Sequence, residues 1–372
     1  MATESAVVAE APQHLTGRTV GQLIWRRFRR NRLARTAGIV IAVLLVMALL
    51  APFLSTMDHT EQSSRHLFAP PQRIYFRDHD TGRLTRPYVY NLDKTRDRET
   101  LRIFYTEDRE QRFPILFFQR GEPYRILWII PGSVRLMSVG EGARWNFWGT
   151  DSLGRDLYSR ILRGSQVSLS VPFVGTFLTI LIGSVMGMIS GYFAGRVDHY
   201  IQRFIEVLIA LPSLPLWLAL AAAMPLSMPS GYRYLLIIVI LSIIDWGGLA
   251  RVVRGKVLQY RGEDFVAAAQ MSGAGLGRII FRHLVPGTLS HLIVVSSLSI
   301  PGVILGESAL SFLGVGITPP LTSWGVLLQD AQKIEVLIQH RWLVLPGIFI
   351  VITVLAFNFF GDGVRDAADP YS

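Results

Sequence analysis

Few residues of this chain could do chemistry, and one polar stretch between two apolar segments has none that could. The stretch EDFVAAAQMSGAG at residues 263–275 opens with two acids, runs through three alanines and ends in glycines separated by single small residues. None of these side chains can do covalent chemistry, so the stretch acts only through its shape and charge. What it is for depends on the elements that present it.

Two further acids, Asp245 and Glu307, adjoin long apolar runs. An acid inside a membrane is a functional candidate by default. Both lie near the ends of their runs, where water is close, and this favours a structural role. The sequence has no GxxxxGK[ST], HExxH or GxSxG motif, which weakens a nucleotide-hydrolysing or hydrolytic interpretation. GAGLG at 273–277 lacks the spacing of a dinucleotide site. We expect no catalytic residue, metal site or directly bound cofactor.

The composition indicates that these residues are carried by membrane helices. Of 372 residues, 50% are hydrophobic and 17% are charged, whereas soluble domains have about 25% charged residues. A bilayer span needs about 20 apolar residues. Five stretches without Asp, Glu, Lys or Arg meet this length: 36–57, 167–195, 207–232, 283–306 and 342–361. A sixth stretch, 234–250, is interrupted only by Asp245. The sequence therefore predicts six transmembrane helices. The first apolar run is too long for a cleaved signal peptide.

Arginine sets the expected orientation. Residues 1–35 hold seven Arg and two Glu, and residues 251–287 hold six Lys or Arg and two acids. Both segments are expected in the cytoplasm. Residues 58–165 then lie outside although they hold 18 Lys or Arg and 14 acids, because the charge rule applies only to short loops. We expect both termini in the cytoplasm. The net charge of +10 is then explained without nucleic acid.

Residues 58–150 are expected to form an extracytoplasmic, β-rich subdomain. RIYFRDHDTGRLTRPYVYNL has two aromatic and β-branched runs about a DTG turn, and RFPILFFQRGEPYRILWII repeats this pattern about RGEP. Both are typical of hairpins. The many aromatic residues disfavour disorder. The alternative is that part of this segment lies on the membrane surface.

Small residues mark helix packing in the second span. Glycines at a spacing of four define one helical face that lets another helix approach closely; they are Gly183, Gly187, Gly191 and Gly195. In the third span, Pro212 and Pro215 are expected to kink or break the helix.

The opening stretch lies in the polar segment 251–287. Asp264 is expected to cap a helix over 265–272, and Gly273 suits the left-handed turn that ends it. LGRIIFRHLVP then resumes a helix before Pro286. The result is a short helix across the membrane mouth, with alanines on its contact surface and charge from Arg278 and Arg282. The residues alone leave a docking helix and an ordinary amphipathic connector open.

This stretch resembles the cytoplasmic loop of ABC importer permeases, EAA, three residues, Gly, nine residues, I-x-L-P. The matching positions are Ala267, Ala268, Ala269, Gly273, His283, Leu284, Val285 and Pro286. Ala267 replaces Glu, His283 replaces Ile and Val285 replaces Leu. GTDSLGRDLYSRILRGSQVSLS at 149–170, LSFLGVGITPPLTSWGVLLQDA at 310–331 and GDGVRDAADP at 361–370 are similar to the peptide/nickel-type permeases. With WGGLARVVRGKVLQYRGEDFV at 246–266, the resemblance covers 149–370. Over 58–148 it is weak, since typical members have a shorter loop there.

The resemblance implies a type I ABC importer permease in the bacterial inner membrane, that is, an all-α polytopic membrane protein with six transmembrane helices and an inserted extracytoplasmic β-rich subdomain. It implies a second homologous permease, two cytoplasmic ATPase subunits that bind ATP, and an extracytoplasmic binding protein, besides membrane lipid. The residues expected to couple to an ATPase are Asp264, Ala267, Ala268, Ala269, Gly273, Arg278, Arg282 and Pro286.

The expected organisation follows from these assignments. It is a cytoplasmic N-terminal segment (1–35), a first helix (36–57), the subdomain (58–150), a permease domain (151–361) with helices near 167–195, 207–226, 234–250, 286–307 and 342–361, a coupling loop (251–287) and a cytoplasmic tail (362–372). Oligopeptides or peptide-like compounds are the preferred cargo. Dipeptides, nickel chelates and oligosaccharides are alternatives, and an uncoupled channel or carrier and a polytopic membrane enzyme are the rival classes.

Overall fold

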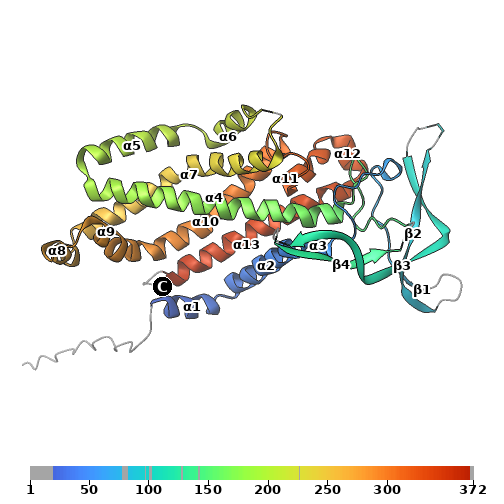
Figure 1. Cartoon of the computed structure of the whole chain (residues 1–372), viewed down its shortest axis with the longest axis horizontal. Helices are drawn as coiled ribbons and strands as arrows, with labels where there is room; N and C mark the ends of the chain where they lie inside the picture. Colours follow the sequence, from blue (N-terminus) through green and yellow to red (C-terminus); the bar gives the residue numbers. More distant parts are fainter. Residues whose placement is uncertain are drawn as a thin grey trace, which may run out of the picture.

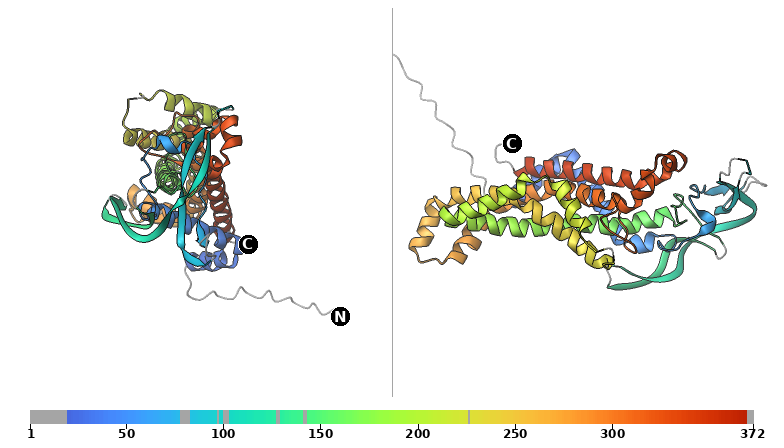
Figure 2. Two further views of the ribbon diagram at one scale, coloured as in Figure 1. Left: turned by 90° about the vertical axis from the view of Figure 1, so that its right-hand side faces the viewer. Right: turned by 90° about the horizontal axis from the view of Figure 1, so that it is seen from above.

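The computed structural model describes residues 20–77, 83–96, 98–99, 103–126, 129–140, 143–225 and 227–368. The molecule is elongated: its long helices lie side by side along one axis, and a β-sheet stands at one end (Figure 1). Seen from two other directions, the sheet keeps its place at the end of the bundle (Figure 2).

Within the described chain, five helices are long and apolar enough to cross a membrane. They are α2 (Arg32–Leu49), α4 (Leu157–Phe193), α7 (Ser230–Arg261), α10 (Val285–Phe312) and α13 (Leu345–Ala368). A sixth span is present if the bent pair α5 (Gly195–Ala210) and α6 (Ser213–Ala222) counts as one. Five of the predicted spans thus correspond to single helices that are long and apolar enough to cross a bilayer.

The third predicted span is broken where the prolines were expected to act. The axes of α5 and α6 differ by 84°. Leu211, between them, is extended with φ −82° and ψ 132°, the conformation that a following proline imposes. Pro212 precedes α6, and Pro215 lies in its first turn, where the missing N–H leaves no helix bond unmade.

The helices are longer than the charge-free stretches. α4 begins at Leu157 rather than near 167, and α7 continues past residue 250 to Arg261. Charged residues are tolerated in these extensions because they find partners: the guanidinium of Arg160 pairs with Asp151, and Arg254 pairs with Asp198 at 2.5 Å. The lengths of uncharged stretches in the sequence therefore underestimate the lengths of both helices.

The other helices surround α4. The largest buried cluster joins α2, α4, α10 and α13 around Trp324, and a second joins α4, α6, α7 and α10 around Leu241. At the N-terminal end, α1 (Val20–Arg30) packs on α13, where the rings of Phe28 and Phe360 meet at 5.3 Å. Asn31 then caps α2, since its side chain accepts a hydrogen bond from the Ala34 N–H at 3.1 Å.

The sheet has four antiparallel strands in the order β1 (Tyr75–Arg77), β2 (Leu84–Arg96), β3 (Ile103–Ile126) and β4 (Ile130–Val139). The first predicted hairpin is present as the β1–β2 pair, although its DTG turn lies outside the described residues. The second prediction is wrong. Residues 120–123, RGEP, do not turn the chain, because β4 pairs with β3 on both sides of them, at Arg120 and at Tyr124.

The sequence RGEP forms an irregularity within one long strand instead. The register of β3 against β4 shifts between Arg120 and Tyr124, and this shift accommodates Pro123, which has no N–H to donate to a ladder. The strand ends further on, at Ile126. A proline and a glycine in a strand can thus mark a bulge as well as a turn.

A polar joint connects the sheet to the bundle. Arg135 of β4 donates from Nη1 to the carbonyl oxygen of Thr56 at 3.2 Å. Asp58 and His59 follow at this joint, with 3.6 Å between His59 Nδ1 and Asp58 Oδ1, and Arg163 of α4 lines the same small hollow. The subdomain is therefore attached by side chains as well as by the connecting chain.

This joint predicts a specific loss of stability in acid. Burial, followed by the positive charge of Arg163, lowers the pKa of His59 from 6.5 to about 4. Because the folded pKa lies below the unfolded one, the stabilisation is complete above pH 6.5 and is lost as the pH falls toward 4. Between pH 7 and pH 5 we expect the folded state to lose about 2 kcal/mol through this group.

Thermal unfolding of the detergent-purified chain at pH 7 and pH 5 measures this loss, with His59→Gln as the control that cannot be protonated. Other groups titrate in both proteins, so the difference between them isolates His59. Equal destabilisation of the two proteins by acid would contradict the prediction.

Candidate functional site

The stretch at 263–275 forms a separate helix at one end of the bundle. α7 ends at Arg261, and α8 (Asp264–Met271) follows almost at once. In Figure 1, α8 lies at the end of the molecule opposite the β-sheet, and the right-hand view in Figure 2 agrees. The two features are thus separated by the length of the helices.

The expected cap of this helix is wrong by one residue. Glu263 occupies the N-cap position, and its side chain makes no capping hydrogen bond. Asp264 is instead the first helical residue and is exposed. Its carboxylate still favours the helix electrostatically, because the N-terminal end carries partial positive charge. A local pattern of two adjacent acids did not distinguish these two positions.

The predicted left-handed turn is present at Gly273, whose φ is +74°. The Gly273 N–H donates to the carbonyl of Gln270 at 2.9 Å, and the Ala274 N–H donates to that of Ala269 at 3.0 Å. This pair of bonds is the Schellman arrangement that ends helices at glycine. A Cβ at Gly273 would meet nothing within 4 Å, so only the backbone conformation limits which residue fits.

α8 offers small side chains outward and anchors itself through one residue. Ala267 and Ala268 are exposed, and Ala269 is half-buried. Val266 is fully buried in a cluster with Val257, Ile279 and Leu284. Met271, at the last position of α8, is 90% exposed.

After the turn, the chain returns to the bundle as the sequence indicated. α9 (Leu276–Ile279) leads into a π-helical turn, Ile280–Leu284, and this leads directly into α10. Arg278, Arg282 and Pro286 are all exposed, as is Phe281, at 75%. Sequence reasoning missed Met271 and Phe281, because apolar residues beside membrane spans are expected to be buried. Their position next to the glycine-rich turn was the available signal.

Three of the four glycines identified in the second span lie against α7. A Cβ on Gly187 would lie 2.5 Å from the carbonyl oxygen of Ala250 and 2.8 Å from Val253 Cβ. Gly183 and Gly191 approach α7 in the same way, with the carbonyl oxygen of Trp246 and Val257 Cβ within 3 Å of an added Cβ. The backbones are therefore too close for any side chain at these glycines.

Gly195 does not belong to this face, contrary to the sequence prediction. It is the first residue of α5, with φ +57°, and a Cβ there would meet nothing within 4 Å. The helix α4 ends at Phe193, so the spacing of four no longer keeps Gly195 in register. The chain turns at this point, and the glycine serves the turn.

The two membrane acids differ in burial. Glu307 is fully buried rather than near water. Its carboxylate accepts hydrogen bonds from Ser311 at 2.7 Å and Ser168 at 3.5 Å, which supports a structural role. Asp245 lies near the middle of α7, because this helix continues beyond the apolar run to Arg261, and its side chain is exposed. It is still only six residues from Arg251, the first cation after that run.

A buried polar network at the sheet end of α4 was not singled out from the sequence. The carboxylate of Asp151 is 2% exposed, and it pairs with Arg155 at 2.7 Å and with Arg160. The next residue, Ser152, bonds to Asp330 through both its N–H and its hydroxyl, at 3.1 and 2.9 Å. These bonds tie the start of α4 to the segment before α13. In the described residues, no group of three or more His, Asp or Glu side chains could hold a metal ion.

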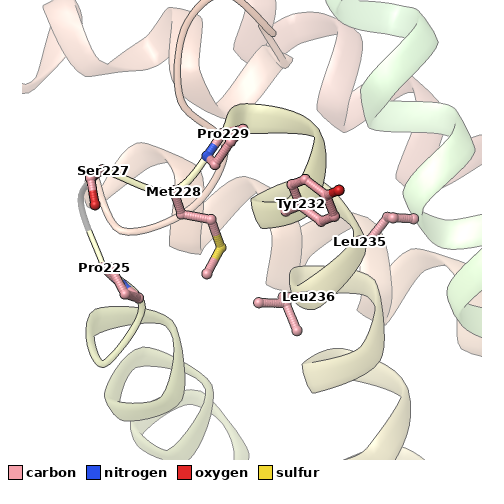
Figure 3. Close-up of a pocket in the computed structure, with 7 residues that line it drawn as sticks. All are labelled: Pro225, Ser227, Met228, Pro229, Tyr232, Leu235 and Leu236. Atoms are coloured by element: carbon pink, nitrogen blue, oxygen red, sulfur yellow. The ribbon is translucent and has the colours of Figure 1, made fainter.

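An open apolar hollow of about 570 Å³ lies where α6 leads into α7. Figure 3 shows Met228, Tyr232 and Leu236 around it, with Pro225 and Pro229 at its edge. Its walls are almost entirely hydrocarbon, so it suits an apolar group rather than a charged one. No motif in the sequence indicated this hollow.

Comparison with known proteins adds what geometry alone cannot. The family model described as "binding-protein-dependent transport system inner membrane component" matches residues 183–371, and that of the "N-terminal TM domain of oligopeptide transport permease C" matches residues 19–71. The whole β-sheet lies between these two matches.

Two relatives align with this chain over most of their own length. The oligopeptide transport system permease protein OppC of Haemophilus influenzae is 41% identical over 61% of this chain and 70% of its own. The dipeptide transport system permease protein DppC of Bacillus subtilis is 36% identical over 76% of this chain and 92% of its own. Among solved structures, the MetNI methionine ABC transporter in inward facing conformations aligns with a TM-score of 0.43 and 16% identity, over 56% of this chain and 96% of that one.

Proposed function

Because this chain belongs to the binding-protein-dependent transport system inner membrane components, we propose that it is one of two permease subunits of an ATP-driven peptide importer. The relatives transport oligopeptides and dipeptides by name. The observation that carries the proposal is the family match over 183–371, which contains α8 and its turn. The chain itself transports and does not hydrolyse ATP.

We propose that α8 is the contact to an ATPase subunit. Its exposed surface combines small side chains, Ala267 and Ala268, with the apolar side chain of Met271. Small residues let a partner approach the helix backbone, and one apolar side chain in a pocket of the partner is the usual form of a binding hot spot. Arg278 and Arg282 supply positive charge beside it. Val266 and the Schellman turn hold the helix to the bundle, so that a partner's movement is passed on.

The remaining parts follow from this assignment. The α8 end faces the cytoplasm, together with both termini, and the sheet faces outward, in keeping with the arginine-rich segments 1–35 and 251–287. A second, homologous permease completes the passage, two ATPase subunits bind ATP, and an extracytoplasmic binding protein delivers the cargo at the sheet end. Oligopeptides or peptide-like compounds are the proposed cargo class.

Uptake into proteoliposomes tests this function. The chain is reconstituted with its partner permease, ATPases and binding protein, with ATP inside the vesicles and labelled trialanine outside. We expect uptake that requires both ATP and the binding protein. Uptake that proceeds equally without ATP would point to a channel or uncoupled carrier instead.

A further inference from the structure

The exposed carboxylate of Asp245 has no partner in the described chain. It lies near the middle of α7, the membrane-spanning helix Ser230–Arg261, and makes no hydrogen bond or ion pair with any described residue. A carboxylate on a membrane-spanning helix is costly in lipid, so it faces water, a partner or a bound group.

No cation on the same helix forms an ion pair with it. Arg251, the nearest in sequence, is six residues further along α7, about 9 Å along the axis and on a different face of the helix. Lys256 is eleven residues further along α7, about 16 Å away at the rise of an α-helix. Arg233 lies twelve residues before it, about 18 Å away, and is buried with its guanidinium bonded to the carbonyl oxygen of Pro225 at 2.9 Å. Arg254 pairs with Asp198. Among the described residues, the countercharge of Asp245 is thus absent.

The space beside Asp245 is bordered by residues without side chains. α7 and α10 are antiparallel and meet at two levels: a Cβ on Gly306 would lie 3.1 Å from Leu241, and the Tyr260 hydroxyl donates to the Gly287 carbonyl at 3.1 Å. Four residues inward from Leu241 and Gly306 are Asp245 and Gly302, which therefore lie at the same level.

Gly302 and Gly248 keep this level open. Both are exposed, and a Cβ on either would meet nothing within 4 Å. A polar group could reach the carboxylate here without displacing a side chain of either helix. Ser299, one turn from Gly302 on α10, is half-buried and adds a hydroxyl.

We propose that Asp245 binds a cationic amino group of the transported compound within the passage, toward its cytoplasmic end; this rests on the proposed importer function. A peptide with a free amino terminus carries an ammonium at neutral pH, and its hydrogen bond to a carboxylate is strengthened by both charges. A permanent ion pair with the second permease is the competing occupant, and co-purification with that subunit distinguishes the two. Asp245 thus sets a preference for cations within the passage itself.

The test compares uptake of trialanine by proteoliposomes that hold the complete complex with wild-type chain, Asp245→Asn, Asp245→Glu or Val252→Asn. We expect Asp245→Asn to lower uptake about tenfold, as the loss of one charge-assisted hydrogen bond would. Asp245→Glu should retain at least half of the wild-type rate. Val252→Asn, a polar change on the same exposed face, should leave the uptake rate close to that of the wild-type chain.

A pH profile separates charge recognition from a structural effect. The α-amino group titrates near pH 8, so the ratio of wild-type to Asp245→Asn uptake should fall toward one between pH 7 and pH 9. Taking the ratio cancels the selectivity of the binding protein. A constant ratio, or an Asp245→Asn chain that no longer co-purifies with the second permease, would overturn the inference. Absence of wild-type uptake would overturn the proposed function and this inference together.

Discussion

A chain carrying Met271→Glu is expected to insert and pair with its partner permease normally, yet to lose its ATPase subunits and all ATP-driven uptake. Met271 is 90% exposed, so the substitution removes no contact within the chain. Docked in a partner, however, the new carboxylate would be buried in a pocket that holds an apolar side chain, and such burial is strongly unfavourable. Each 1.4 kcal/mol lost weakens binding about tenfold, so we expect ATPase binding to fall at least tenfold.

Pull-down of the ATPases with detergent-purified chain measures this loss. Ile338→Glu is the matched control, because Ile338 is an apolar side chain of α12 (Ile334–Gln339) that is 66% exposed. It lies at the sheet end of the molecule, far from α8 (Figure 1), and should leave ATPase binding unchanged. Full ATPase binding and full uptake by Met271→Glu would refute the proposed contact.

The second large effect is expected from Gly187→Leu. The first carbon of the new side chain would lie 2.5 Å from the Ala250 carbonyl oxygen. Backbone cannot turn away as a flexible side chain can, so α4 and α7 must separate. Overpacking typically costs 1–3 kcal/mol, and we expect about 3 kcal/mol here because two backbones are forced apart. The thermal midpoint of the purified chain and the yield of assembled complex should both fall.

Gly231→Leu provides the comparison for this substitution. Gly231 lies in the first turn of α7, and a Cβ there would meet nothing within 4 Å. The same added volume should therefore change neither the thermal midpoint nor the yield. If Gly187→Leu were as stable as Gly231→Leu, the close approach of α4 to α7 would be wrong.

Features set by short-range patterns could be predicted from the sequence. Apolar length located the spans, since bilayer thickness fixes the helix length that crosses it. The turn at Gly273 and the break at Pro212 were predictable because each depends on the conformational limits of one residue. The docking role of α8, by contrast, came from the resemblance, since its alanines fit a connector equally well.

Features that depend on distant partners could not be predicted in this way. Whether residues 120–123 turn or continue is decided by pairing with β4, which lies later in the chain. Glu307 is held by Ser168, 139 residues away, so its burial is invisible in its own surroundings. Gly195 follows Gly191 at the same spacing of four, but it does not lie on the glycine face of α4, because α4 ends two residues before it.

The uninterrupted length of α7 gives the molecule a mechanical property. Its 32 residues make a rod about 48 Å long at 1.5 Å per residue, and only Gly262 and Glu263 separate its end from α8. Such a rod acts as a lever arm: a tilt of about 5° at the α8 end sweeps the far end sideways by about 4 Å, by the geometry of a straight helix. Because α4 packs closely along α7 at three glycines, a tilt of α7 is expected to carry α4 with it. The bend between α5 and α6 then lies beside a helix, α7, that has no bend of its own.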